Sequence, residues 1–157
     1  MKIVKYILVV LLVALVVIQF IRPETNDSGY ESITFFEQET KPSAEVASIL
    51  KKNCYDCHSN HTQYPWYAQM APFSFWLDDH IEHGKGHFNA AAWESYSLKK
   101  KDHKMEELVE MVEAGEMPLD SYTWIHGDLT EAEQQMLLEW AGLVRLQYQT
   151  QMEVSSK

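Results

Sequence analysis

The hydrophobic pattern begins with an apolar run that has no polar face. The 16 residues from Tyr6 to Ile21 carry no charge. As a helix, this run is about 24 Å long, slightly short of the hydrocarbon core of a bilayer, but Lys5 can snorkel and the apolar residues before it add length. No small-residue cleavage site follows the run. The pattern therefore predicts a single transmembrane helix, with residues 1–22 as an uncleaved signal anchor.

Charge predicts the orientation of this anchor. Lys2, Lys5 and the initiator amine precede the apolar run, and no acidic residue lies before Glu24. Positive charge next to a membrane helix stays on the cytoplasmic side. We therefore expect a single-pass protein of the bacterial cytoplasmic (inner) membrane, whose C-terminal domain lies in the periplasm.

The pattern changes after the apolar run. Residues 23–42 are mainly polar, with turn-forming residues near their start, and predict a tether in which a few apolar residues form a short arm that packs on the domain. Residues 43–148 carry the hydrophobic spacing of helices, and residues 149–157 form a polar tail. The sequence thus predicts an anchor, a tether, one domain and a tail.

Within the predicted domain, apolar residues recur three and four positions apart, which favours an all-α fold. In chain order, the pattern predicts a helix capped by Ser43, a short helix over 75–82 that is broken at Gly84 and Gly86, a helix over 99–114 that ends at Gly115, a loop at 119–128, and a last helix that starts from a capping box at 130–133.

Charge also narrows the class of partner. Ten of the 13 basic residues and all 23 acidic residues follow residue 23, which gives that part a formal charge of −13. Such a surface disfavours nucleic acid, so we expect no nucleic-acid partner. It keeps a domain in solution and suits a basic redox partner. The one basic cluster, Lys99–Lys101 with Lys104, is expected to be a solvated helix face, with a docking patch as the alternative.

The strongest chemical signal is the pentapeptide Cys54-Tyr55-Asp56-Cys57-His58. Two cysteines with two residues between them and a histidine directly after form the attachment sequence for a c-type haem. Each thiol can bond one vinyl group of the porphyrin, and the histidine is then delivered to the iron as proximal ligand. The motif uses both cysteines of the chain. The alternative is a zinc site of Cys54 and Cys57 with two histidines, although no second cysteine pair is present.

The sixth ligand of such an iron is predicted to be Met117. It lies 59 residues after His58 in a Gly-x-Met-Pro run, and the following proline stiffens the loop that would hold its thioether. His80 and His87 are the alternatives. Together with His83 they recur at helical spacing, so three histidines that bind a transition metal form a further alternative.

The chain resembles the haem-binding domain family, found largely in membrane-anchored proteins of Bacteroidetes-type bacteria. The resemblance covers roughly residues 45–145 and rests on 54–60 (CYDCHSN), 64–67 (YPWY), Pro72, Trp76, His80-Ile81, Gly84, His87-Phe88-Asn89, Trp93, 115–119 (GEMPL) and Ser121-Tyr122. It implies a small, mostly helical, cytochrome c-like domain with one covalent haem. Lys85 stands where relatives are expected to carry arginine, which weakens any pairing of a guanidinium with a haem propionate there.

The sequence therefore predicts a membrane-tethered monohaem c-type cytochrome. His58 and Met117 would close both axial positions of one covalent haem c, so the protein would pass single electrons to redox partner proteins and would not be an enzyme. The alternative is a haem-based sensor or peroxidase-like protein with an open or weakly held distal site, which the distal histidines favour.

Overall fold

The computed structural model describes residues 2–155, and every element in that range is helical. An isolated bridge between Asp27 and His61 is the only β pairing among these residues. The α-helices are α1 (Lys2–Ile18), α2 (Thr34–Thr40), α3 (Ala44–Asn53), α4 (Tyr55–His58), α5 (Phe73–His87), α6 (Leu98–Glu113), α7 (Asp120–His126) and α8 (Glu131–Ser155), and the 3₁₀ helices are η1 (Tyr30–Ile33), η2 (Trp66–Gln69) and η3 (Ala90–Ser95). The all-α prediction is confirmed.

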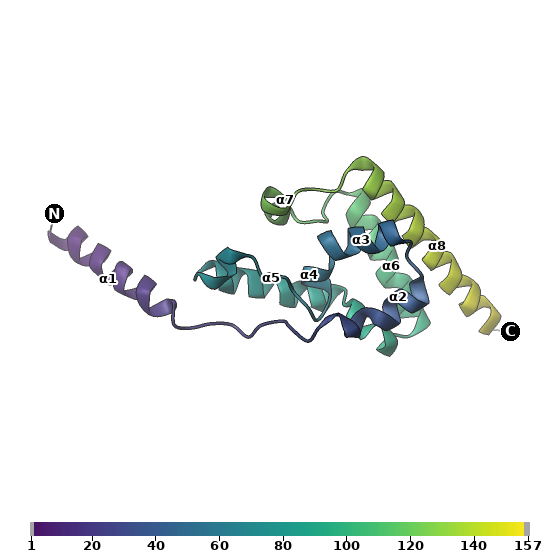
Figure 1. Ribbon diagram of the computed structural model, residues 1–157, viewed down its shortest axis with the longest axis horizontal. Helices are drawn as coiled ribbons and strands as arrows, with labels where there is room; N and C mark the ends of the chain where they lie inside the picture. The colour runs from purple at the N-terminus through teal and green to yellow at the C-terminus, as the bar shows by residue number, and fades with distance from the viewer. Residues whose placement is uncertain (1, 156–157) are drawn as a thin grey trace.

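Helix α1 lies apart from the helical body at the N-terminal end, and an extended segment leads from it to η1 (Figure 1). Gln19, just after the helix, donates to the Ala71 carbonyl at 3.0 Å and accepts from the Ala71 amide at 3.0 Å. Arg22 donates to the carbonyl of Gln69 at 2.6 Å. The chain that follows α1 is therefore fastened along the residues around η2.

The length of α1 corrects the predicted anchor. The helix has 17 residues, which gives about 25 Å at 1.5 Å per residue and falls below the hydrocarbon thickness of about 30 Å. Among residues 2–155 no helix is both long and apolar enough to cross a membrane. This finding contradicts the predicted transmembrane helix, the single-pass membrane anchor at 1–22, and the inner-membrane and periplasmic localisation derived from it.

The segment predicted as a tether contains two helices that belong to the body. Ile33 at the end of η1 and Phe36 in α2 are 6% and 0% exposed. The ring of Phe36 meets Trp93 edge-on at 4.9 Å and Trp140 at 6.1 Å. Aromatic rings in such perpendicular pairs add to the stability that burial supplies. Residues 30–40 therefore pack on the body and contribute Ile33 and Phe36 to the hydrophobic core.

The C-terminal half supplies most of the scaffold. Helix α6 packs along α8 more extensively than any other pair of helices (Figure 1). Met105 and Val112 of α6 and Leu137 and Val144 of α8 are buried between them. Helix α8 continues through the segment predicted as a tail as far as Ser155.

A polar network crosses this core. The Glu39 carboxylate accepts from Lys101 Nζ at 2.7 and 2.9 Å and from the Tyr148 hydroxyl at 2.7 Å. The same hydroxyl accepts from Trp93 Nε1 at 3.1 Å. Lys101 is only 6% exposed, so the expected solvated face of lysines is wrong at this position, where the ammonium group joins α6 to α2.

We expect Lys101→Ala to destabilise the protein by about 2–3 kcal/mol, because it leaves the Glu39 carboxylate largely buried without its cation. Urea unfolding followed by far-UV circular dichroism measures the change. Lys99→Ala is the matched control, since Lys99 is an exposed lysine on the same helix and its loss should change stability by less than about 0.5 kcal/mol. Equal midpoints for the two variants would contradict the role assigned to Lys101.

Candidate functional site

The Cys-X-X-Cys-His segment lies where α3 turns into α4. Ser43 caps α3 as predicted by accepting from the amide of Val46 at 3.2 Å, and the helix ends at Asn53. The single turn of α4 then begins with Tyr55, which is 1% exposed and donates to Glu37 at 3.1 Å. This buried tyrosine anchors the segment to the body, while Cys54, Cys57 and His58 remain partly exposed beside it.

His58 is held in one orientation by two backbone carbonyls. Its Nδ1 lies 3.0 Å from the Gly84 oxygen and 2.9 Å from the Phe88 oxygen. A carbonyl oxygen can only accept, so Nδ1 carries the proton and Nε2 keeps its lone pair. Burial lowers the pKa of His58, which favours the neutral ring. A neutral imidazole whose Nδ1–H donates to a carbonyl is the form that binds a metal through Nε2.

Helix α5 supplies one of these carbonyls by passing very close to α4. A Cβ built on Gly84 would lie 2.9 Å from the Cys57 carbonyl oxygen and 3.1 Å from Cys57 Cβ. The predicted break at Gly84 and Gly86 is therefore wrong, because α5 is continuous over Phe73–His87. Because Gly84 has no Cβ, the backbones of α5 and α4 can approach closely. This contact outweighs the low helix propensity of glycine.

The two thiols are protonated at neutral pH. Burial raises the pKa of Cys54 to about 12 and that of Cys57 to about 11. Zinc binds thiolates, so these environments oppose a zinc site. Within residues 2–155, no three histidine, cysteine or carboxylate side chains are grouped to hold a metal ion, and the zinc alternative therefore finds no ligand set there.

The other candidate ligands occupy different elements. Met117 follows the end of α6, where Gly115 takes a φ of +69° and the Met117 amide donates to Met111 at 3.1 Å. Met117 and Cys54 both pack, partly buried, against the same hydrophobic core. His80 and His87 lie on α5, where His80 Nδ1 bonds the Trp76 carbonyl at 2.8 Å and His87 is exposed.

Three residues near the motif were not singled out as ligands or contacts by the sequence. The segment 119–128, expected as a loop, contains α7. The Tyr122 hydroxyl of this helix lies 3.4 Å from Asp56 Oδ2, and the His126 ring stacks on Tyr122 at 4.3 Å. His126 Nε2 lies 3.0 Å from the hydroxyl of Tyr67 in η2. The sequence signal for Tyr122 and His126 is their spacing of four residues, which places both rings on one face of a helix.

Large apolar side chains are exposed on η2, α5 and α7. Trp66 of η2 is 77% exposed and Trp124 of α7 is 83% exposed, and both elements are joined by the Tyr67–His126 contact. Phe73 and Trp76 at the start of α5 are exposed as well. A porphyrin has two large apolar faces that flat aromatic rings cover efficiently. The residues present therefore fit a haem bound at Cys54–His58.

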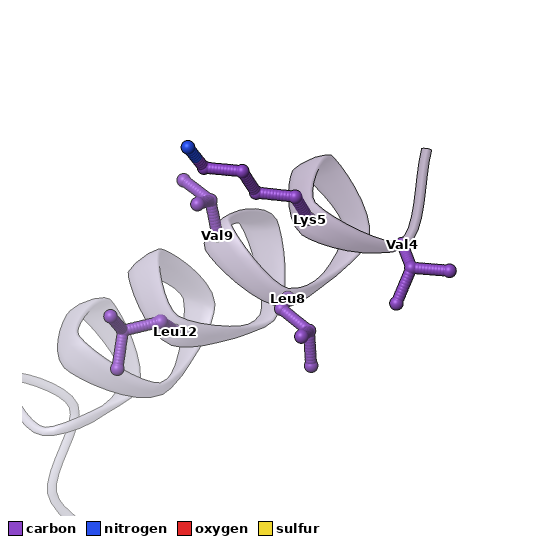
Figure 2. Close-up of a pocket in the computed structure, with 5 residues that line it drawn as sticks. All are labelled: Val4, Lys5, Leu8, Val9 and Leu12. Carbon is purple, nitrogen blue, oxygen red and sulfur yellow. The ribbon is translucent and has the colours of Figure 1, made fainter. Parts of the chain in front are cut away.

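The hollow drawn in Figure 2 belongs to another part of the molecule. It is lined by Val4, Lys5, Leu8, Val9 and Leu12, all of which come from α1. The side chains splay outward from a single helix, and the Lys5 ammonium is their only polar group. Lys5 is the only ionisable side chain in this set, so the hollow offers no pair of groups for acid–base chemistry.

The comparison with protein families gives one match, to a model described as a haem-binding domain, over residues 13–142. The matched region covers most of the chain and contains Cys54, Cys57, His58 and Met117. The comparisons with curated proteins and with solved structures gave no match.

Proposed function

Because the chain belongs to the haem-binding domain family, we propose that this haem-binding protein is a monohaem c-type cytochrome that transfers single electrons. Cys54 and Cys57 hold one haem covalently, and His58 and Met117 are its axial ligands. The observation that carries the proposal is the pair of hydrogen bonds from His58 Nδ1 to the Gly84 and Phe88 carbonyls. They leave Nε2 with a free lone pair.

The thiols supply the attachment chemistry. Each sulfur forms a bond to one carbon of a vinyl group, and the thiol proton passes to the other carbon of that group. The product is a thioether, and no electron is gained or lost. Each thiol therefore supplies both the sulfur and the proton that the addition needs.

Closed axial positions favour electron transfer over catalysis. A haem supplies one-electron exchange between ferric and ferrous iron, and an iron with two protein ligands has no open position for a substrate. The formal charge of −13 after residue 23 supports a basic redox partner, and α5, the helix that contacts Cys57, carries Asp78, Asp79 and Glu82. Opposite charge on a partner would raise the rate of encounter.

The second candidate function is a haem sensor or peroxidase-like protein. The Tyr67–His126 pair favours it, because polar groups beside a vacant iron position can orient oxygen or peroxide. Carbon monoxide separates the two functions. Rapid binding to the reduced protein supports an open distal site, whereas slow binding supports the electron carrier.

The deciding experiment is the optical spectrum of the oxidised and reduced protein, expressed with a haem-maturation system. His/Met ligation is expected to give a charge-transfer band at about 695 nm, and Met117→Leu should abolish that band while the haem stays attached. Met136→Leu is the matched control, because Met136 lies on α8 and is exposed. An unmodified protein without the band, or a Met117→Leu variant that keeps it, contradicts the assignment of Met117.

A further inference from the structure

Helix α7 has no buried side chain to hold it against the body. None of its seven residues is buried, and Trp124 and Ile125 are 83% and 62% exposed. Burial of apolar surface, which holds most helices in place, therefore contributes little here. Specific side-chain contacts have to position this helix.

These contacts come from two tyrosines and one histidine. The Tyr122 hydroxyl lies 2.8 Å from the Lys52 carbonyl at the end of α3, and also 3.4 Å from the Asp56 carboxylate. The His126 ring stacks on the Tyr122 ring with only 15° between their planes. Its Nε2 then meets the hydroxyl of Tyr67 at 3.0 Å.

The three side chains connect segments that are far apart in the sequence. Tyr122 reaches residues 52 and 56, on either side of Cys54, and His126 reaches η2. Within residues 2–155, these are the side-chain hydrogen bonds that join α7 to other elements. The net free energy of each hydrogen bond is small, but three contacts that join α7 to the body stabilise its position together.

The position of α7 also sets the position of Met117. The methionine lies between two fixed points: its own amide is bonded to Met111 in α6, and two residues later Leu119 accepts the amide of Tyr122 at 2.8 Å. A displacement of α7 therefore moves the short segment 117–119 directly.

We propose that Tyr67, Tyr122 and His126 form a latch that holds α7 against the haem-attachment segment and thereby positions Met117 toward the iron. The proposal rests on the function proposed above. The latch residues are positioning residues: they keep the thioether at the iron and do not bind the metal themselves. When the latch opens, Met117 withdraws and the sixth position becomes accessible to a small ligand.

The test uses the full-length, haem-loaded protein and the variants Tyr122→Phe, Tyr67→Phe and the double variant. Each substitution removes one hydroxyl and keeps the ring. Tyr96→Phe is the control, because Tyr96 lies at the end of η3, where its ring contacts Trp93, and no hydrogen bond from its hydroxyl is present in the described part of the chain. The measurements are the rate of carbon monoxide binding to the reduced protein and the band at about 695 nm.

We expect carbon monoxide to bind about fivefold faster for each hydroxyl removed, and about 25-fold faster in the double variant, with a weaker 695 nm band. Tyr96→Phe should bind at the rate of the unmodified protein. Hydrogen exchange of the α7 amides should accelerate in the same variants, a change that a general loss of stability would spread over all helices.

Four results overturn the latch. Unchanged carbon monoxide rates in the double variant, with the band present in the unmodified protein, would overturn the latch alone. Absence of the band from the unmodified protein would overturn the ligation by Met117 and, with it, the proposal that the latch positions this residue. Faster binding in Tyr96→Phe would show a non-specific effect. A haem spectrum that changes in His126→Ala but not in the tyrosine double variant would show that His126 acts on the haem directly and not through the latch.

Discussion

The double variant Cys54→Ser and Cys57→Ser is expected to lose covalent haem completely. A hydroxyl group does not add to a vinyl group as a thiol does, and the chain has no other cysteine to replace them. Mass spectrometry of the denatured protein should give the mass of the bare chain, and the haem stain on a denaturing gel should vanish. The unmodified protein should carry one haem per chain.

The single variants are the matched controls for this result. With one thiol left, Cys54→Ser and Cys57→Ser should each keep one thioether and therefore keep a weaker stain. Expression of the unmodified chain without a haem-maturation system should give no stain. The proposed attachment is contradicted if the double variant still carries covalent haem, or if the unmodified protein is colourless despite a working maturation system.

The second large effect is expected at Gly84. In Gly84→Ala the new methyl group would lie 2.9 Å from the Cys57 carbonyl oxygen, so α5 must move away from α4. Overpacking of this kind typically costs 1–3 kcal/mol, against a gain of up to ~1 kcal/mol from better helix propensity. We expect a net loss of stability of about 1–2 kcal/mol, together with a weaker contact between His58 Nδ1 and the Gly84 carbonyl.

Gly86→Ala is the control on the same helix. Nothing lies within 4 Å of a Cβ built on Gly86, so only the gain in helix propensity remains and the variant should be neutral or more stable by up to ~1 kcal/mol. The two substitutions are chemically identical, but Gly84→Ala should lower the stability of the protein and Gly86→Ala should not. Thermal unfolding and the yield of haem-loaded protein measure both. Equal behaviour of the two variants would show that the approach of α5 to Cys57 is not tight.

The local pattern of the sequence was sufficient for the helices with clear caps. Ser43 caps α3, and Gly115 follows the end of α6 with the positive φ that glycine favours. Thr130 and Glu133 exchange hydrogen bonds as the predicted capping box before α8. In each case the donors and acceptors lie within four residues of one another, so the signal is contained in a short window.

The same local rules failed where long-range contacts decide. Gly84 and Gly86 predict a break in the helix, but α5 is continuous, and Gly84 lies there because a Cβ at this position would clash with the backbone of Cys57. Residues 119–128 were expected to form a loop, although Tyr122 and His126 hold a helix in place there. The apolar run at the N-terminus predicts a membrane anchor over residues 1–22, but the helix ends at Ile18 and is shorter than the predicted span.

The sequence by itself determined the haem-binding family and the all-α character, and it contains the Cys-X-X-Cys-His motif from which the proposed attachment starts, because thiol spacing and helical periodicity are local properties. Only the tertiary structure decided which nitrogen of His58 is free, why α5 continues through Gly84, and how α7 is held. The physical reason is the distance along the chain. His58 bonds carbonyls 26 and 30 residues away, and Tyr122 bonds a carbonyl 70 residues away. Such contacts exist only once the chain has folded and leave no periodic pattern in the sequence.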